Sequence, residues 1–174
     1  ASVQAGPSVQ VHWQINTSDP DVREYVLYRS TTDGFIPSEE TKIGNATDTL
    51  FIDGSPISGV VNYYRVVTMD IHGNSSNPSS QAEASVAQTS TYSMNDKWNM
   101  VSVPLTVNDY TKTVLYSTSV SNAISYHDGY STQTVLANGI GYWIKFSGAQ
   151  NVPMTGLLRT EETITVSEGW NMIG

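Results

Sequence analysis

The chain has 174 residues, a hydrophobic fraction of 39% and ten tyrosines, a composition typical of globular packing rather than of disorder. Its formal net charge of −8 disfavours nucleic acid as a partner, because phosphate binding needs a basic face. The absence of cysteine excludes disulfides, thiolate metal sites and cysteine nucleophiles. No apolar run approaches the roughly 20 residues that span a bilayer, so we expect no membrane insertion.

The first predicted strand lies in the stretch SVQVHWQIN, residues 8–16. Four apolar residues alternate with polar ones there: Val9, Val11, Trp13 and Ile15. A period of two is typical of a half-buried strand. We expect this apolar face, with Trp13 on it, to be buried between two sheets.

Further strand-like segments follow up to residue 88, separated by segments rich in Asn, Asp, Gly, Pro and Ser. They are REYVLYRS (23–30), TKIG (41–44), TLFID (49–53), VVNYYRVVTMD (60–70) and QAEASV (81–86). Short strands at this spacing predict an antiparallel β-sandwich.

The motifs VHW, YVLYRS and YYRVVTMDIHGNSSNPS make residues 1–88 similar to fibronectin type III domains of the bacterial secreted kind. The resemblance implies that Trp13 is the core tryptophan of the second strand. It also implies that four more residues face the core: Tyr25, Leu27, Tyr64 and Val66. Two features depart from the family. Asn62 lies where the corner tyrosine usually stands, which predicts a corner held differently, and the first strand should begin several residues before Val3.

Residues 89–96 are polar and predict a linker, after which residues 97–174 form a second, small β-domain. The stretch KWNMVSVPL (97–105) predicts a strand ended by Pro104. In SNAISYHDGYSTQTV (121–135), Asp128 and Gly129 can supply the positive-φ positions of a hairpin turn. The segments GYWIKF (141–146), NVPMTG (151–156) and ETITVSEG (162–169) complete the domain, with at most one short helix in residues 106–122.

The tripeptide Trp-Asn-Met occurs twice, at residues 98–100 and 170–172. With it, the second half of the chain resembles a β-rich module found near the C-termini of secreted bacterial proteins, in which a GWN phrase opens each of two similar halves. The resemblance implies an incomplete repeat, in which Trp170 begins a second half that is mostly absent. The alternative is that both Trp-Asn pairs merely start strands with a core residue.

No pattern in the chain predicts catalysis or metal binding. The three histidines, His12, His72 and His127, are scattered and lack the spacing of a metal site, so we expect them at surface or turn positions. No serine lies in a GxSxG turn, and adjacent carboxylates such as Glu161 and Glu162 would point to opposite faces of a strand. We expect no enzyme, no catalytic residue, no cofactor and no metal ion.

Aromatic residues are the remaining candidates for a site. In GYWIKF, three residues of one parity form the expected core face: Tyr142, Ile144 and Phe146. Trp143 then lies near a rim, close to Tyr130 of the hairpin. Exposed on a flat sheet, these rings could stack on sugars; the alternative is that they pack in the core or at its rim.

The two chain ends suggest a second kind of site. A sheet that lacks an edge strand exposes unpaired main-chain groups and recruits a strand from elsewhere. One expectation is a protein partner or self-association through strand edges, with Trp170 and Met172 packing into an apolar groove at a junction, and filaments as one outcome. The alternative is that the missing strands were removed by truncation or proteolysis of a longer chain.

These features favour a non-catalytic structural, adhesion or assembly module of a secreted or cell-surface protein. The competing interpretation is an accessory carbohydrate-binding region of a secreted hydrolase, with polysaccharide as the partner.

Overall fold

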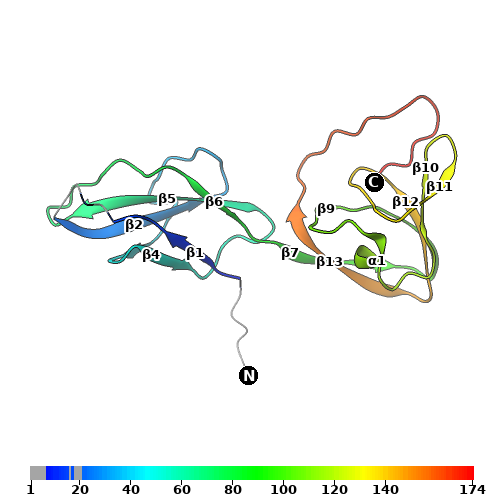
Figure 1. The fold of residues 1–174 in the computed structure, drawn as a ribbon, viewed down its shortest axis with the longest axis horizontal. Coiled ribbons are helices and arrows are strands. Elements are labelled where there is room, and N and C mark those ends of the chain that lie inside the picture. The colour runs from blue at the N-terminus through cyan, green and yellow to red at the C-terminus, as the bar shows by residue number, and fades with distance from the viewer. Residues whose placement is uncertain (1–6, 16, 18–20) are drawn as a thin grey trace, which may run out of the picture. The chain divides into compact units, whose positions relative to one another are not determined.

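The computed structural model describes residues 7–15, 17 and 21–174. In these residues the protein is almost entirely antiparallel β-structure, with one four-residue helix, α1 (Lys112–Leu115). The fold is therefore all-β, as the periodicity predicts. The chain divides into two compact units, Ala1–Val86 and Ala87–Gly174 (Figure 1).

The first unit is a β-sandwich whose two sheets contain four and two strands (Figure 1). The four-stranded sheet has the order β3-β2-β5-β6, and the other sheet pairs β1 with β4. The strands are β1 (Val9–His12), β2 (Val22–Ser30), β3 (Lys42–Ala46), β4 (Leu50–Asp53), β5 (Val61–Asp70) and β6 (Ala82–Ser85). Each matches a segment with strand-like alternation. The start of a strand expected before Val3 lies outside the described residues.

The core of the first unit lies between the two sheets and is made by alternate residues of the long strands. Tyr25 and Leu27 of β2 are buried together with Tyr64 and Val66 of β5, and Val11 of β1 contacts them from the opposite sheet. The predicted inward orientation of these residues is confirmed. For the four residues of β2 and β5 this orientation was implied by the resemblance to fibronectin type III domains; burial alone does not reveal it, because Val26, between Tyr25 and Leu27, is buried as well.

The prediction for the first strand is only partly right. Trp13 packs edge-to-face on Tyr25, with ring centroids 5.3 Å apart, but its side chain is half-buried rather than enclosed. Ile15, expected on the same buried face, is 67% exposed. The reason is that β1 ends at His12. The N–H of Trp13 still donates to the carbonyl of Thr49, just before β4, but Ile15 lies beyond the end of the strand.

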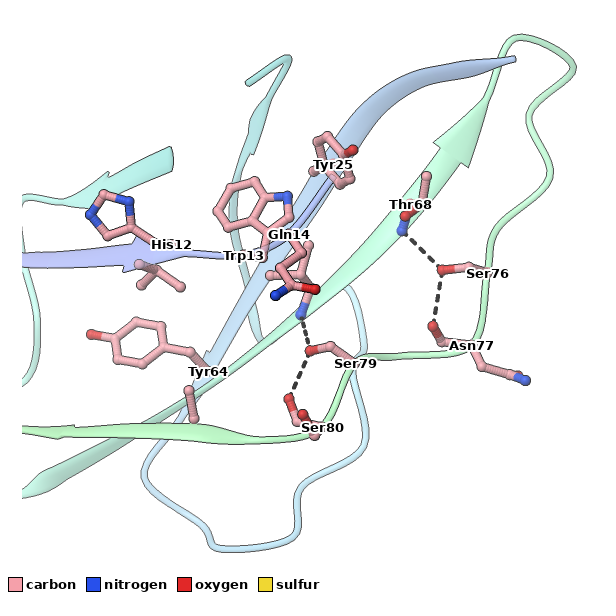
Figure 2. A pocket seen from close by; sticks show the side chains of 13 residues that line it. His12, Trp13, Gln14, Tyr25, Tyr64, Thr68, Ser76, Asn77, Ser79 and Ser80 are labelled. Carbon is pink, nitrogen blue, oxygen red and sulfur yellow. Dashed lines mark hydrogen bonds between the residues drawn. The ribbon is translucent and has the colours of Figure 1, made fainter. Parts of the chain in front are cut away.

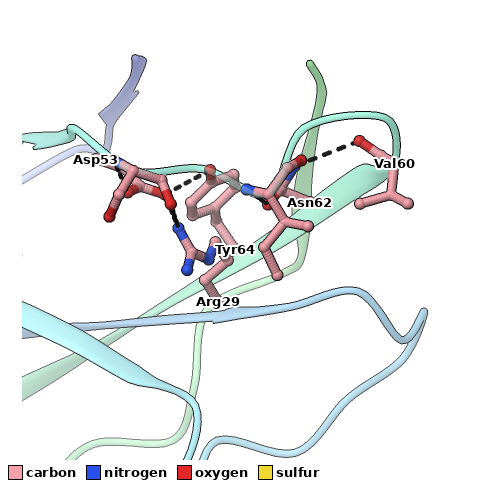
Figure 3. Close-up of polar contacts among 7 residues, drawn as sticks. Arg29, Asp53, Val60, Asn62 and Tyr64 are labelled. Atoms are coloured by element: carbon pink, nitrogen blue, oxygen red, sulfur yellow. Dashed lines mark hydrogen bonds and ion pairs between the residues drawn. The ribbon is translucent and has the colours of Figure 1, made fainter. Parts of the chain in front are cut away.

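Asn62 holds the corner before β5, where the sequence predicts an unusual arrangement (Figure 3). Its side chain is fully buried. The amide oxygen accepts from the N–H of Ile57 at 2.9 Å, and the amide nitrogen donates to the carbonyls of Ile57 at 2.9 Å and Val60 at 3.3 Å. A single side chain thus satisfies three main-chain groups of one loop, which is how this corner is closed.

A buried polar cluster lies beside that corner (Figure 3). The Asp53 carboxylate, 4% exposed, accepts from the Arg29 guanidinium at 2.7 Å and from the Tyr64 hydroxyl at 2.9 Å. Its other oxygen accepts from the N–H of Ser55 at 3.1 Å. Burial and the neighbouring Asp53 carboxylate raise the pKa of Tyr64 well above its usual range. Because every charge in the cluster is paired and hydrogen-bonded, it joins β2, β4 and β5 without an orphaned ion.

The second unit also consists of two antiparallel sheets (Figure 1). One has the order β11-β10-β12-β8 and the other β7-β13-β9. The strands are β7 (Gln88–Met94), β8 (Lys97–Val101), β9 (Leu105–Thr106), β10 (Ala123–Tyr126), β11 (Tyr130–Gln133), β12 (Tyr142–Phe146) and β13 (Gln150–Leu158). The helix α1 adds Leu115 to a core that includes Ile144 and Phe146, both with no exposed surface.

Two segments of the second unit differ from the expectation. Residues 89–94, read from the sequence as part of a linker, lie in β7, which pairs with β13 along its whole length. Its polar side chains bond across the sheet, as in the 2.7 Å contact between the hydroxyls of Thr89 and Thr155. Residues 162–169, expected as a strand, have no regular structure, and their apolar Val166 is 60% exposed.

The hairpin prediction is confirmed. Asp128 and Gly129 adopt φ angles of 54° and 154° between β10 and β11, and Tyr126 pairs with Tyr130 across the turn. Both residues lie where a left-handed conformation is needed, which Asp tolerates and Gly adopts without cost.

Candidate binding face on the second unit

The outer face of the sheet β11-β10-β12-β8 carries large apolar side chains that point away from the core. Parity decides this orientation, since Tyr142, Ile144 and Phe146 of β12 are buried and Trp143 therefore points to the other side. The apolar and aromatic residues that point outward from the four strands are Trp98, Met100, Ile124, Tyr126, Tyr130 and Trp143. We call this set the aromatic face.

Cross-strand pairing places these side chains next to one another. Trp143 lies opposite Met100 on one neighbouring strand and opposite Ile124 on the other. Tyr126 and Tyr130 face each other at the hairpin, with ring centroids 5.2 Å apart and an edge-to-face angle of 71°. Directly opposed side chains on one face of an antiparallel sheet are in contact, so the face is continuous across all four strands.

The face is open to solvent. Trp98 is 49% exposed, Met100 54% and Tyr130 70%. Exposed apolar side chains are normal when they occur singly, but a contiguous group of this kind marks an interaction surface. The aromatic face is the strongest candidate for a site in the second unit.

The repeated tripeptide forms the same turn twice. Asn99 accepts from the N–H of Asn95 at 2.9 Å and donates to the carbonyls of Asn95 and Lys97 at 2.9 and 3.2 Å. Asn171 accepts from the N–H of Ser167 at 3.0 Å and donates to the carbonyls of Ser167 and Gly169 at 2.9 and 3.1 Å. Each asparagine therefore bonds the residues four and two positions before it.

The backbone of the two turns agrees as well. The residue two positions before the asparagine has a positive φ in both, 76° at Lys97 and 93° at Gly169. Such a φ is uncommon for lysine and easy for glycine. The repeat is therefore a structural unit, an asparagine-closed turn that presents the intervening tryptophan outward, since Trp98 is 49% and Trp170 87% exposed. Neither tryptophan is the strand-starting core residue of the alternative interpretation.

The four residues expected from the sequence lie together. One groove of about 570 Å³ is lined by Tyr130, Trp143, Trp170 and Met172, together with Met100, Tyr126, Asn171 and Ile173. A neighbouring groove of about 510 Å³ is lined by Trp98, Ile124, Tyr130 and Trp143. Because Tyr130 and Trp143 line both, the two grooves form one surface.

Trp98, Met100 and Ile124 belong to this surface but were missed as site residues. The signal was present in KWNMV, where Trp98 and Met100 share one parity and the buried Val101 has the other. This alternation could not show which side of the strand is exposed, because that depends on where the second sheet of the unit packs.

The C-terminal segment reaches the surface by pairing with its own chain. Ile173 forms an antiparallel bridge with Ile140, and the N–H of Gly141 donates to the carbonyl of Met172 at 3.0 Å. Trp170 and Met172 thus line a groove of their own unit. The sequence predicts that they pack into an apolar groove at a junction instead. A C-terminal strand exchanged between copies would have to displace this pairing.

The lining of both grooves carries no formally charged side chain. Lys145 is exposed on the same face, opposite Trp98. Two other tyrosines of this unit, Tyr116 and Tyr142, are buried in its core and do not line these grooves. Burial raises the pKa of the Tyr116 hydroxyl, which donates to the carbonyl of Ser102, and of Tyr142, whose oxygen accepts from the N–H of Ala137 at 2.9 Å.

The histidines are where they were expected, since His12, His72 and His127 are all exposed. Over residues 7–15, 17 and 21–174, no three His, Cys, Asp or Glu side chains come close enough together to hold a metal ion. In the same part of the chain no helix is long and apolar enough to cross a membrane.

Comparison with protein-family models, with curated proteins and with solved structures found no match to this chain. Function must therefore be argued from the geometry of the face and from the sequence resemblances.

Proposed function

We propose that the protein is a non-catalytic module of a secreted or cell-surface protein, with a role in structure, adhesion or assembly, and that it holds a protein partner on the aromatic face. The single observation that carries this proposal is the continuous group of Trp98, Met100, Tyr130 and Trp143 on one face of the sheet, of which Trp98, Met100 and Tyr130 are exposed and Trp143 is half-buried. Tryptophan and tyrosine are the residues that dominate protein interfaces when they lie near the centre of a buried patch.

The composition of the face favours a protein over other partners. Besides its rings it carries aliphatic and thioether side chains, among them Ile124, Met100 and Met172. Methionine adapts to irregular apolar surfaces, and the absence of charge in the lining matches the depletion of charged residues at interface cores. The resemblance to fibronectin type III domains and to the GWN-repeat module supports the bacterial, extracellular setting.

The alternative function is carbohydrate binding within a secreted hydrolase. The rings of Trp98 and Trp143 lie on the neighbouring strands β8 and β12, and that of Tyr130 lies on β11, with β10 between β11 and β12. Neighbouring strands are spaced about 4.8 Å apart, so the rings offer flat apolar surfaces spread across the sheet. Sugar rings stack on such surfaces, but they also need precisely placed polar partners. In the lining of these two grooves of the second unit, Asn171 is the only amide side chain, and it is engaged in its own turn.

A photo-crosslinking experiment tests the protein-binding proposal. A benzophenone amino acid at Thr132, which is exposed and pairs with Ile124 at the edge of the face, should crosslink one protein from the extracellular fraction of the source cells. The same probe at Glu83, exposed on β6 of the first unit, is the position control. The yield should fall at least about tenfold in Trp98→Ala combined with Trp143→Ala, because truncated hot-spot side chains each cost 2 kcal/mol or more.

Val120→Ala is the matched control variant, since Val120 is 59% exposed on the same unit but lies outside both grooves. It should leave the crosslink unchanged. An unchanged yield in the double tryptophan variant would refute the proposal. Saturable binding to insoluble polysaccharide that is lost in Trp143→Ala, with no protein crosslink, would establish the alternative.

A further inference from the structure

The aromatic face has two distinct ends along the strand direction. On β12, Lys145 lies two residues beyond Trp143. On the antiparallel neighbour β10, Ile124 pairs with Trp143, and Tyr126 lies two residues further on in the opposite direction. With a rise of about 3.4 Å per residue, Lys145 is about 7 Å from the row of Trp143 on one side and Tyr126 about 7 Å on the other. We call these sides the lysine end and the hairpin end.

The hairpin end is acidic. Asp128 lies at the tip of the hairpin with its side chain 93% exposed, and the imidazole of His127 is 3.9 Å from its carboxylate. Glu168 is exposed on the asparagine-closed turn that carries Trp170, which lines the groove at this end. Neither Glu168 nor Lys145 forms an ion pair with a described residue. The face therefore carries uncompensated charges of opposite sign at its two ends.

A protruding tryptophan and an open apolar groove also lie at opposite ends. Trp170, at the hairpin end, is 87% exposed, so most of its ring extends away from the groove that it lines. The groove of about 510 Å³ reaches the lysine end, where Trp98, opposite Lys145, forms its wall. All four side chains that line it are apolar or aromatic. A surface with a protrusion at one end and a groove at the other is complementary to itself after a twofold rotation.

The charges select one way for two such faces to meet. A twofold axis along the strands would stack the two lysine ends on each other and the two acidic ends on each other. An axis across the strands, through the row of Trp143, places the lysine end of each copy over the hairpin end of the other. Opposed like charges cost free energy, so the second arrangement is favoured. It also brings Trp170 of each copy to the groove beside Trp98 of the other.

The centre of this contact is apolar. The axis across the strands brings the row of Ile124, Trp143 and Met100 against its own copy. A central tryptophan is typical of an interface hot spot, and methionine adapts to irregular apolar surfaces. Long-range repulsion is weak, because residues 89–174 carry four Lys or Arg against six Asp or Glu, a net charge of −2.

The groove of the first unit is a poorer receptor for the same tryptophan. It has a volume of about 420 Å³, and polar side chains surround much of it, among them Ser76, Asn77 and Ser79 (Figure 2). An indole placed there would take these groups away from water while offering them a single donor. The apolar groove of the second unit carries no such cost.

We propose that the partner held on the aromatic face is a second copy of this chain, packed face to face with reversed strand direction as a closed dimer. Trp170 of each copy fills the groove beside Trp98 of the other, and Lys145 of each copy approaches Asp128 and Glu168 of the other. Both copies use the same surface, so the contact closes at two copies rather than continuing into a filament. Because it names the partner of the aromatic face, this inference rests on the proposed function.

Sedimentation equilibrium of the purified chain measures the association. We expect a mass that rises with concentration to twice the 19.0 kDa of one chain and then stays constant. Trp170→Ala should raise the dissociation constant at least about tenfold, because a tryptophan that fills an interface pocket contributes a large share of the binding free energy. Val166→Ala is the matched control and should change nothing, since Val166 is 60% exposed on the same C-terminal segment but lines neither groove.

Charge variants test the orientation. Lys145→Glu makes both ends acidic, and Asp128→Asn combined with Glu168→Lys makes both ends basic. Each variant alone should dimerise at least about tenfold more weakly, because like charges then oppose each other. An equimolar mixture of the two should form a mixed dimer with the affinity of the wild type, which shows that neither variant is misfolded.

Three results would overturn the inference. The first is the mass of one chain at every concentration up to about 1 mM. The second is a dimer that Trp170→Ala leaves unchanged, which would place the contact on another surface. The third is a dimer with wild-type affinity in both charge variants, which would exclude the reversed orientation.

The photo-crosslinking experiment separates this inference from the proposed function. The mass of one chain together with a crosslink from Thr132 to a different protein would overturn the second copy as the partner and leave the proposed function standing. The mass of one chain together with no crosslink that depends on Trp98 and Trp143 would overturn both.

Discussion

Asn62 offers the sharpest test of how the first unit is held together. Asn62→Ala removes three hydrogen bonds to the loop before β5 and leaves the main-chain groups of Ile57 and Val60 without this partner. Each bond contributes about 1 kcal/mol net, so we expect the free energy of unfolding of the first unit to fall by about 3 kcal/mol. The side chain is fully buried, which argues against replacement of the lost bonds by solvent in an unchanged loop.

The matched variant is Asn62→Asp, which has nearly the same shape. It keeps an acceptor for the N–H of Ile57 but replaces the donor to two carbonyls with an acceptor, so it should destabilise at least as much as alanine. Urea unfolding followed by NMR signals of each unit, for example Val66 in the first and Ile144 in the second, measures the change separately. A loss below about 1 kcal/mol for Asn62→Ala, or an aspartate variant as stable as wild type, would refute this account of the corner.

Three further predictions concern the turns, the buried tyrosine and two glycines. Asn99→Ala and Asn171→Ala should each cost about 1 to 2 kcal/mol, less than Asn62→Ala because these asparagines are only half-buried, and thermal unfolding should rank them accordingly. The raised pKa of Tyr64 means that its stabilising contribution is complete below its ordinary pKa of 10.0 and is lost as the pH rises above that value. The first unit should therefore lose stability in alkali, and a pH titration of unfolding in Tyr64→Phe should show a smaller loss; a part should remain, because burial also raises the pKa of Tyr28 in the same unit. In Gly156→Ala the new Cβ would lie within contact of the Thr106 carbonyl oxygen and require a shift, which should cost about 1 to 3 kcal/mol. Gly54→Ala meets no atom within 4 Å and should be nearly neutral or slightly stabilising in the same assay.

Much of the fold could be predicted because strand formation leaves a local signal. Alternation in β12 identified Tyr142, Ile144 and Phe146 as the buried face, and the resemblance to fibronectin type III domains implied the core positions of Tyr25 and Tyr64, which are buried. The turn at Asp128 and Gly129 was equally local, since left-handed φ angles restrict the residue type at the position itself. The aromatic residues of the candidate face could be named for the same reason, because parity within GYWIKF separates Trp143 from the core.

The predictions that were wrong concern segments whose structure depends on pairing with strands distant in the chain. Residues 88–94 are polar, and their place in a sheet results from pairing with β13, about sixty residues later. Residues 162–169 alternate as a strand would, yet no sheet edge pairs with them in the described structure. Ile15 alternates correctly with Trp13, but β1 ends before it. Alternation states which residues could share a face, and only pairing decides whether there is a sheet.

By itself the sequence determined the all-β class, the strands of the first unit and the repeat of Trp-Asn-Met. Each of these follows from the order and spacing of residues that are close together in the chain. Only the tertiary structure decided that the phrase is an asparagine-closed turn and that Trp98 and Trp170 point outward. It also decided that Tyr130, Trp143, Trp170 and Met172 line one groove. These features arise where strands from separate parts of the chain meet, and the spacing of residues along the chain carries no information about which edges meet.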